Sequence, residues 1–323
     1  MRRKLSLLLV LFLLCLVISV RPVLAADQNT ALLAAVQQGD EAAVTSLLAQ
    51  GADLEATDEL GRTALLIAVE QGQLDLVRSL LQAGAKINVK TKDGESPFLL
   101  AARHNQPQIL QLLFEQSVDG KDYLSALYLA AKYNYPEVVK VLGEQIDLYY
   151  FVENVLCLAA KYGSNEVINL LLTAGIKINI NSPGIDIESE EKSALKWGPL
   201  FYAVAYDQLE TAELLLTKGK AQTHYDDIHK RSVLMLACEK GNAPMVALLL
   251  DHGASLNAWD EEGWTPLMYA AKNGRVEVIK LMLERNPKLN LNRTNNKKET
   301  ALDIANAHHQ TAVVELLKAA GAK

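Results

Sequence analysis

The sequence predicts an all-α solenoid of about nine helix-turn-helix repeats with short projecting loops. A pattern recurs nine times: a helix-capping residue, most often Thr or Ser, an apolar residue two positions later, and an alanine three positions beyond that. Successive alanines are 33, 33, 29, 29, 44, 34, 33 and 35 residues apart, and they are Ala35, Ala68, Ala101, Ala130, Ala159, Ala203, Ala237, Ala270 and Ala305. Self-similarity at this period indicates small stacked units, each burying its apolar face against its neighbours.

Within each repeat the sequence predicts two helices, and the second repeat shows why. Thr63 is suited to cap the first helix, because its hydroxyl can accept a hydrogen bond from a backbone N–H of the first turn. Gly72 can adopt the left-handed conformation that ends this helix. The second helix carries Val77, Leu80 and Leu81 at spacings of three and four, which gives one buried stripe.

The eighth repeat carries the pattern in its fullest form, with a capped helix start, two alanines and an apolar second helix. Its segments are Thr265-Pro266-Leu267, Ala270-Ala271, Asn273-Gly274, Val276-Glu277-Val278-Ile279 and Leu281-Met282-Leu283, and the loops add Gly51-Ala52-Asp53 and Gly253-Ala254-Ser255-Leu256-Asn257-Ala258. These segments resemble the ankyrin repeat. The resemblance covers residues 27–323 and implies an ankyrin-repeat solenoid with a role in recognition.

One position departs from the pattern that the resemblance implies. Ankyrin repeats usually have a histidine two residues before the alanine, and this slot holds Leu33, Leu66, Leu99, Tyr128, Cys157, Phe201, Met235, Met268 and Asp303. The polar network that this histidine makes between repeats is therefore expected to be absent. We expect a stack held mostly by apolar packing.

The predicted organisation is a signal peptide over 1–25 followed by one ankyrin repeat domain over 27–323. The repeats lie near 27–60, 61–93, 94–122, 123–151, 152–181, 196–229, 230–262, 263–297 and 298–323, with an insertion at 182–195. The insertion is interpreted as an enlarged surface loop, because loops tolerate added residues at small cost. A finger that contacts a partner is the alternative.

The N-terminal residues have the composition of a secretory signal peptide. Arg2, Arg3 and Lys4 precede an apolar run of 16 residues, and the small residues that follow predict cleavage after Ala25. An uncleaved anchor is the alternative, although the run is shorter than the roughly 20 apolar residues that span a bilayer. We expect a periplasmic location in a Gram-negative bacterium, with secretion as the alternative.

Charge and cysteine content limit the possible partners. Cleavage would leave 28 Lys and Arg against 38 Asp and Glu, a formal charge of −10, which argues against nucleic acid as a ligand. No membrane association is expected after cleavage, and the protein is expected to be a monomer. Cys157 and Cys238 lie two repeats apart, roughly 16–20 Å at the usual helix spacing, which is beyond disulfide reach. Both are expected to be unpaired core residues.

No motif in the sequence indicates catalysis. The chain has no phosphate-binding glycine-rich loop, no His-Glu-x-x-His and no Gly-x-Ser-x-Gly. His308 and His309 are adjacent but lack the further ligands that a metal site needs. We therefore expect a protein that is not an enzyme and that has no cofactor and no metal. A hydrolase that uses His104 remains a third class of hypothesis.

Comparison of equivalent positions across repeats identifies a candidate binding surface. The resemblance implies that the two residues before the end of each first helix face a concave groove, where His104, Tyr133, Tyr162 and Tyr206 would form one row. Arg103, Lys132 and Lys161 would place cations beside it. With two tryptophans that precede first helices and one further lysine, the predicted partner-binding residues are Arg103, His104, Lys132, Tyr133, Lys161, Tyr162, Trp197, Tyr206, Trp264 and Lys272.

The sequence thus predicts a non-catalytic scaffold that binds a partner protein with an acidic patch through this groove, because Tyr and Arg commonly anchor interfaces. The alternatives are an accessory factor that supports an exported enzyme and a secreted effector that acts on a host protein. A structural interpretation also stands: the tyrosines could pack against one another and stiffen the stack.

Overall fold

The computed structural model of the chain describes residues 28–116, 122–146, 148–184 and 196–323. The predicted signal peptide and most of the predicted insertion lie outside these residues. The described residues form helices, turns and loops without a β-strand, apart from one isolated antiparallel bridge between Asp226 and Ser232. The predicted all-α solenoid of ankyrin repeats is confirmed.

The helices follow one another in pairs, one pair to a repeat. The first pair is residues 28–38 and α2 (Glu41–Ala49). The pairs that follow are α3 (Ala64–Glu70) and α4 (Leu74–Gln82), α5 (Pro97–Arg103) and α6 (Pro107–Phe114), α7 (Tyr123–Lys132) and α8 (Pro136–Gln145), α9 (Val152–Tyr162) and α10 (Asn165–Thr173), α12 (Pro199–Ala205) and α13 (Leu209–Thr217), α14 (Val233–Lys240) and α15 (Ala243–Asp251), α16 (Pro266–Lys272) and α17 (Val276–Arg285), α18 (Ala301–Ala307) and α19 (Thr311–Ala319). A short 3-10 helix, η2 (Leu148–Tyr150), precedes α9.

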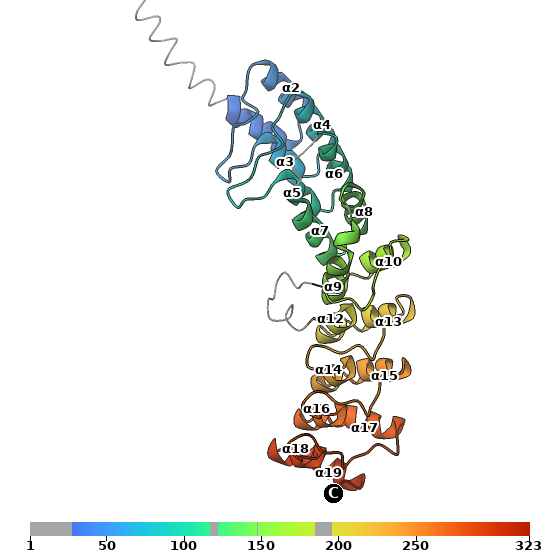
Figure 1. Cartoon of the computed structure of the whole chain (residues 1–323). Coiled ribbons are helices and arrows are strands. Elements are labelled where there is room, and N and C mark those ends of the chain that lie inside the picture. The colour runs from blue at the N-terminus through green and yellow to red at the C-terminus, as the bar shows by residue number, and fades with distance from the viewer. Residues whose placement is uncertain (1–27, 117–121, 147, 185–195) are drawn as a thin grey trace, which may run out of the picture. The chain divides into compact units, whose positions relative to one another are not determined.

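The chain divides into two compact units. The first comprises Met1–Ala130 and Glu137–Ile146, and the second comprises Ala131–Pro136 and Asp147–Lys323. In the second unit the first helices of successive repeats contact one another in the order α9, α12, α14, α16, α18, and the second helices do so in the order α10, α13, α15, α17, α19 (Figure 1). In the first unit α3 packs against α5 and α4 against α6. Both units therefore consist of parallel rows of equivalent helices.

The recurrent alanines form the centre of this packing. Each of the nine is buried, because a methyl side chain lets neighbouring first helices approach closely. Thr63 accepts a hydrogen bond from the backbone N–H of Leu66, as predicted for the cap of α3. Gly72, just after that helix, has a φ of 72°. In four other repeats the equivalent left-handed residue is Asn105, Asn134, Asp207 or His309, which are the residue types that tolerate this conformation best after glycine.

Polar contacts replace the absent histidine within some repeats. In α16 the sulfur of Met268 accepts the backbone N–H of Thr265 at 3.4 Å. In α18 a carboxylate oxygen of Asp303 accepts the backbone N–H of Thr300 at 2.9 Å. These residues occupy the histidine slot, so the slot still contributes a hydrogen bond at the start of the first helix.

Hydrogen bonds also join successive repeats, from a position that the sequence did not indicate. In several repeats the residue before the second helix donates to a carbonyl in the last turn of the first helix of the preceding repeat. Gln310 Nε2 donates to the carbonyl of Lys272 at 3.3 Å, and Arg275 Nε donates to that of Glu239 at 3.0 Å. The expectation of a stack held mostly by apolar packing is therefore incomplete. Hydrogen bonds between repeats therefore exist. They come from the residue before the second helix and not from the histidine slot in the first helix.

The two cysteines of the described residues belong to the core, as predicted. Cys157 and Cys238 are buried and neither forms a disulfide. Burial raises the pKa of the Cys238 thiol well above its ordinary value, because the charged thiolate is disfavoured away from water. The Cys238 thiol is therefore uncharged at neutral pH while its repeat is folded.

Candidate binding surface

The predicted row of tyrosines forms a continuous series with lysines in the second unit. Lys132 Nζ lies 5.9 Å from the ring centroid of Tyr133 and 4.8 Å from that of Tyr162. Lys161 Nζ lies 5.5 Å from the ring of Tyr162 and 5.4 Å from that of Tyr206. At these distances each ammonium group is attracted to the faces of two rings. We call these five residues the tyrosine–lysine ladder.

Neighbouring repeats fix the backbone that presents the ladder. Ser164 Oγ donates to the carbonyl of Lys132 at 3.3 Å, and Gln208 Nε2 donates to the carbonyl of Lys161 at 3.3 Å. The side chain of Asn134 accepts the backbone N–H groups of Glu166 and Val167 at 3.0 and 3.1 Å, which caps the start of α10. The backbone carbonyls of both lysines are thus held from the next repeat.

Exposure divides the ladder into a core end and a surface end. Lys161 is only 6% exposed, and Tyr162 and Tyr206 are half-buried around it. Tyr133 is 46% exposed, and its ring lies 6.0 Å from that of Tyr135. The members of the ladder therefore differ in exposure: Lys161 is buried between two rings, and Tyr133 faces solvent.

Two predicted site residues lie in the first unit and are described apart from the ladder. Arg103 ends α5 and His104 follows it, and both side chains are exposed. Arg103 forms an ion pair with Glu95. The Arg103 guanidinium is therefore engaged within its own repeat.

Trp197 was predicted to contact a partner, and its position corrects that prediction. The side chain is only 5% exposed and its ring lies 5.8 Å from the rings of both Phe201 and Tyr202. The residue comes just before α12, where an apolar ring gains more from covering the first turn than from exposure to water. Trp197 therefore belongs to the core.

Trp264 and Lys272 form a further pair of an aromatic ring and a cation, like the pairs of the tyrosine–lysine ladder. Lys272 Nζ lies 5.4 Å from the Trp264 ring, which in turn lies 5.4 Å from the ring of Tyr269. The Tyr269 hydroxyl donates to a carboxylate oxygen of Asp260 at 2.7 Å. Burial, together with this hydrogen bond, raises the pKa of Tyr269 above its ordinary value.

A depression of about 240 Å³ lies beside Tyr269, in a place that sequence reasoning missed. Its lining residues are His229, Arg231, Asp260, Glu261, Glu262 and Tyr269. Arg231 makes ion pairs with Asp227 at 3.0 Å and with Glu239 at 3.7 Å, so its charge is compensated by carboxylates of this chain. The sequence did contain a sign of this ion pair beside the depression. An Asp lies four residues before an Arg both at Asp58 and Arg62 and at Asp227 and Arg231.

The described residues offer no support for metal chemistry, because they contain no group of three or more His, Cys, Asp or Glu side chains arranged to hold an ion. Within the same part of the chain, every helix is too short or too polar to cross a membrane.

The chain belongs to the ankyrin repeat family. The family model described as "Ankyrin repeats (3 copies)" matches residues 6–91, 85–151, 200–295 and 259–323, which together cover most of the chain. Ankyrin repeats generally mediate protein–protein interaction. A protein partner is therefore the class of ligand that the family supports.

Relatives of this chain match it over a minority of its length. The ankyrin repeat protein FPV223 of Fowlpox virus is 34% identical over 98 residues, covering 29% of this chain and 65% of its own length. Transient receptor potential cation channel subfamily A member 1 of Homo sapiens is 33% identical over 110 residues, covering 33% of this chain and 10% of its own length. Inversin-B of Xenopus laevis is 45% identical over 76 residues, covering 23% of this chain and 8% of its own length. The chain thus spans less than two thirds of each of these relatives.

Proposed function

We propose that this chain is a non-catalytic protein–protein interaction scaffold that binds its partner through the tyrosine–lysine ladder. The observation that carries the proposal is the exposure of Tyr133, a ring that is 46% exposed and lies against Lys132 in a repeat array. Aromatic rings with adjacent cations bury a large area at small entropic cost, and they are enriched where interfaces are anchored.

The expected partner carries an acidic, partly apolar patch. The chain has a formal net charge of −6, so Lys132, beside the exposed Tyr133, forms a local positive region on an otherwise acidic protein. Charge complementarity at such a region favours a partner carboxylate and speeds its association. The rings of Tyr133 and Tyr162 offer apolar faces beside it.

The proposed compartment is outside the cytoplasm, in the periplasm or secreted. The support is the sequence pattern of residues 1–25, with three basic residues, an apolar run and small residues before Ala26. Fractionation of the source cells followed by N-terminal sequencing tests this proposal. Recovery from the periplasm with Ala26 as the first residue supports it, and a cytoplasmic protein with intact Arg2 and Arg3 contradicts it.

The binding proposal is tested by affinity capture from a periplasmic extract with the tagged full chain. Tyr133→Ser and Lys132→Glu are expected to reduce recovery of the partner at least tenfold. The matched control is Tyr150→Ser, because Tyr150 is 72% exposed in η2, at the opposite end of α9 from Tyr162. Thermal unfolding of each variant shows whether the fold is retained. Equal recovery by all four proteins would exclude the ladder as the binding surface.

A further inference from the structure

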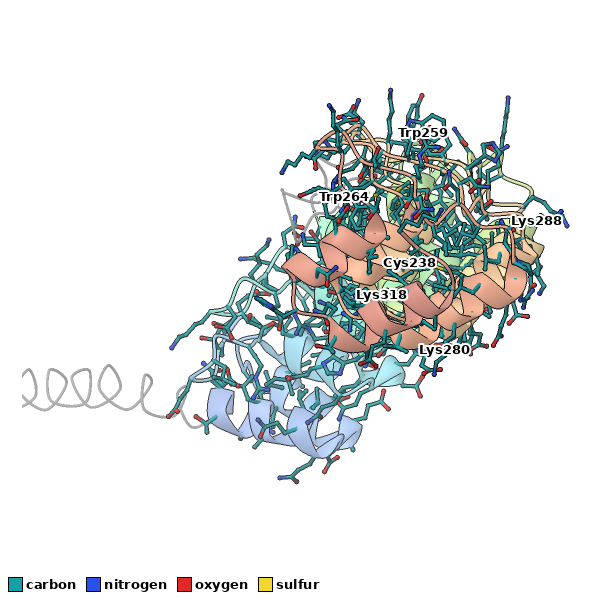
Figure 2. All side chains as sticks on the ribbon, turned by 90° about the horizontal axis from the view of Figure 1, so that it is seen from below. Cys238, Trp259, Trp264, Lys280, Lys288 and Lys318 are labelled. Atoms are coloured by element: carbon teal, nitrogen blue, oxygen red, sulfur yellow. The ribbon has the colours of Figure 1, made fainter. Side chains whose placement is uncertain are left out.

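A second exposed aromatic surface lies on the projecting loops of the second unit. Trp259 is 56% exposed in the loop between α15 and α16, and Figure 2 shows it among the loops, farther from the helices than Trp264. The preceding loop carries Tyr225 and Ile228, which are 41% and 42% exposed. Tryptophan is highly buried on average, so this degree of exposure is unusual.

Backbone hydrogen bonds hold three successive loops side by side. The N–H of Glu261 donates to the carbonyl of His229 at 3.2 Å, which joins the loop of Ile228 to that of Trp259. The N–H of Asn296 donates to the carbonyl of Glu262 at 2.9 Å, which joins the loop of Trp259 to the next one. These hydrogen bonds therefore hold the three loops that carry the exposed side chains in fixed positions relative to one another.

Arg293, from the third of these loops, stacks on Trp259. Its guanidinium carbon lies 4.0 Å from the centroid of the indole ring. A guanidinium on a ring face is attracted by the π-electrons, and the contact fixes the orientation of its planar N–H donors. The loss of side-chain freedom on binding an anion is thereby reduced.

The donors of this guanidinium are available to a ligand. Arg62, Arg231 and Arg285 each form ion pairs with carboxylates of this chain. For Arg293 the structure records no ion pair and no side-chain hydrogen bond with any residue in the part of the chain that it describes. An oriented and unneutralised guanidinium is a site for a carboxylate, which it can bind through two parallel hydrogen bonds.

The charges exposed around Trp259 and Arg293 are of both signs, with Lys230, Lys297 and Lys298 on the adjoining loops, so they do not form a continuous basic patch. Glu261 and Glu262 are exposed at the tip of the loop that carries Trp259. Closely spaced like charges would repel a polyanion such as nucleic acid or an anionic membrane. A single carboxylate flanked by apolar side chains avoids this repulsion.

We propose that Trp259 and Arg293, with Ile228 on the adjoining loop, form a docking surface for a linear peptide segment of a partner protein. The segment carries an isolated Asp or Glu next to an aromatic or branched apolar side chain. The carboxylate binds the Arg293 guanidinium, and the apolar side chain covers the exposed aromatic surface. This inference rests on the loops alone and does not depend on the tyrosine–lysine ladder.

The test uses a phage library of random 12-residue peptides selected on the full chain, with no depletion on a variant, so that peptides for any site can be recovered. Synthetic copies of the selected peptides are then measured by fluorescence anisotropy. We expect each peptide to hold one acidic residue beside an aromatic or branched residue. Affinity should fall at least tenfold for Trp259→Ser and for Arg293→Gln. Arg293→Lys should also bind more weakly, because lysine cannot pair with a carboxylate in the bidentate geometry.

Two residues of the first unit provide matched controls. Leu60 is 56% exposed on a projecting loop, the same exposure as Trp259, and Arg78 is exposed without a recorded ion pair. Leu60→Ser, Arg78→Gln and the ladder variant Tyr133→Ser should leave peptide affinity within twofold of the unchanged protein. Circular dichroism melting confirms that the loop variants fold.

Several outcomes would overturn the inference. Peptides that bind Trp259→Ser and Arg293→Gln as well as the unchanged chain show that the loops are not the site. If a peptide keeps its full affinity after its Asp or Glu is replaced by Asn or Gln, the carboxylate has no role in binding. Binding to phosphatidylserine vesicles that depends on Trp259 and Arg293, without peptide selection, would identify a lipid surface as the ligand instead. Loss of peptide binding in Tyr133→Ser would assign the peptides to the ladder.

Discussion

The residue that follows each first helix determines how closely the next repeat can approach. Gly163 has a φ of 73°, and a Cβ built on it would lie 2.5 Å from Oε1 of Gln208. Gln208 is the side chain that donates to the carbonyl of Lys161 in the ladder. Gly175, after the second helix of the same repeat, has a φ of 72° but nothing within 4 Å of the equivalent Cβ. The two glycines thus have nearly the same backbone conformation, but only Gly163 lies close to another side chain.

This pair separates backbone strain from crowding. Both Gly163→Ala and Gly175→Ala are expected to lower the free energy of unfolding by about 1 kcal/mol, because alanine is disfavoured at positive φ. Gly163→Ala should cost about 1 kcal/mol more, since Gln208 must move and its hydrogen bond is lost. Urea unfolding of both variants measures the difference. Equal losses would show that Gln208 adjusts without cost.

Tyr269 gives a prediction for alkaline pH. Its pKa is raised in the folded protein by burial and by Asp260, so its contribution to stability is complete below the ordinary tyrosine pKa of about 10 and declines as the pH rises further. At pH 7, Tyr269→Phe should lower the free energy of unfolding by about 1.5 kcal/mol through loss of the hydrogen bond. This difference from the unchanged protein should shrink between pH 10 and pH 11 as measured by urea unfolding. A constant difference would contradict the prediction.

The ladder itself could be located from the sequence only in part. Equivalent positions placed Tyr133, Tyr162 and Tyr206 in one row, because that argument needs only the repeat period. It did not reveal that Lys161 would be almost fully buried, since burial depends on how the rings of two repeats close over the stem. Trp197 was misassigned for a related reason: a position before a helix can face either the groove or the core.

At the scale of the element, the start of α18 shows how a cap is built without the usual histidine. Asp303 accepts hydrogen bonds from both the backbone N–H and the hydroxyl of Thr300, at 2.9 and 2.7 Å. The Thr300 hydroxyl in turn accepts the N–H of Asp303 at 3.2 Å. Hydrogen bonds from Thr300 to the charged carboxylate lower the pKa of Asp303.

The Asp303 cap predicts a dependence of stability on acidic pH. Because the folded pKa is lowered, the stabilisation is present above the unfolded pKa of about 4 and is lost as the pH falls through the folded pKa. Asp303→Asn should therefore be less stable than the unchanged protein by about 0.5–1 kcal/mol at pH 7. The difference should close as the pH falls below about 4 in thermal unfolding. Thr300→Val, which removes the hydroxyl but keeps the backbone N–H, should weaken this pH dependence without abolishing it. A gap between Asp303→Asn and the unchanged protein that persists at pH 2 would refute the assignment.

Helix positions were predictable because capping and periodicity are local properties. The caps at Thr63 and Thr265 were visible in the sequence and are present in the structure. The hydrogen bonds from Gln208, Arg275 and Gln310 to the preceding repeat were not foreseen, since two kinds of side chain, glutamine and arginine, form the equivalent bond. The geometry they share becomes apparent only when repeats are stacked.

At the scale of the whole molecule, a repeat array transmits stability from neighbour to neighbour. In the second unit successive helix pairs contact one another, from α9 and α10 to α18 and α19. Local opening in such an array is expected to begin in terminal repeats and to spread through adjacent interfaces. A weakened terminal repeat should therefore affect a nearby repeat more than a distant one.

The two buried cysteines can measure this transmission. Cys238 is fully buried in α14, two repeats from α18, and Cys157 is buried in α9, four repeats from α18. A thiol reagent reacts only when a repeat opens, because burial suppresses the thiolate. Thr300→Ala should speed modification of Cys238 several-fold and leave that of Cys157 within twofold, as followed by peptide mass spectrometry in dilute urea. Equal acceleration at both thiols would mean instead that the second unit opens as one cooperative block, with interfaces between repeats stronger than the repeats themselves.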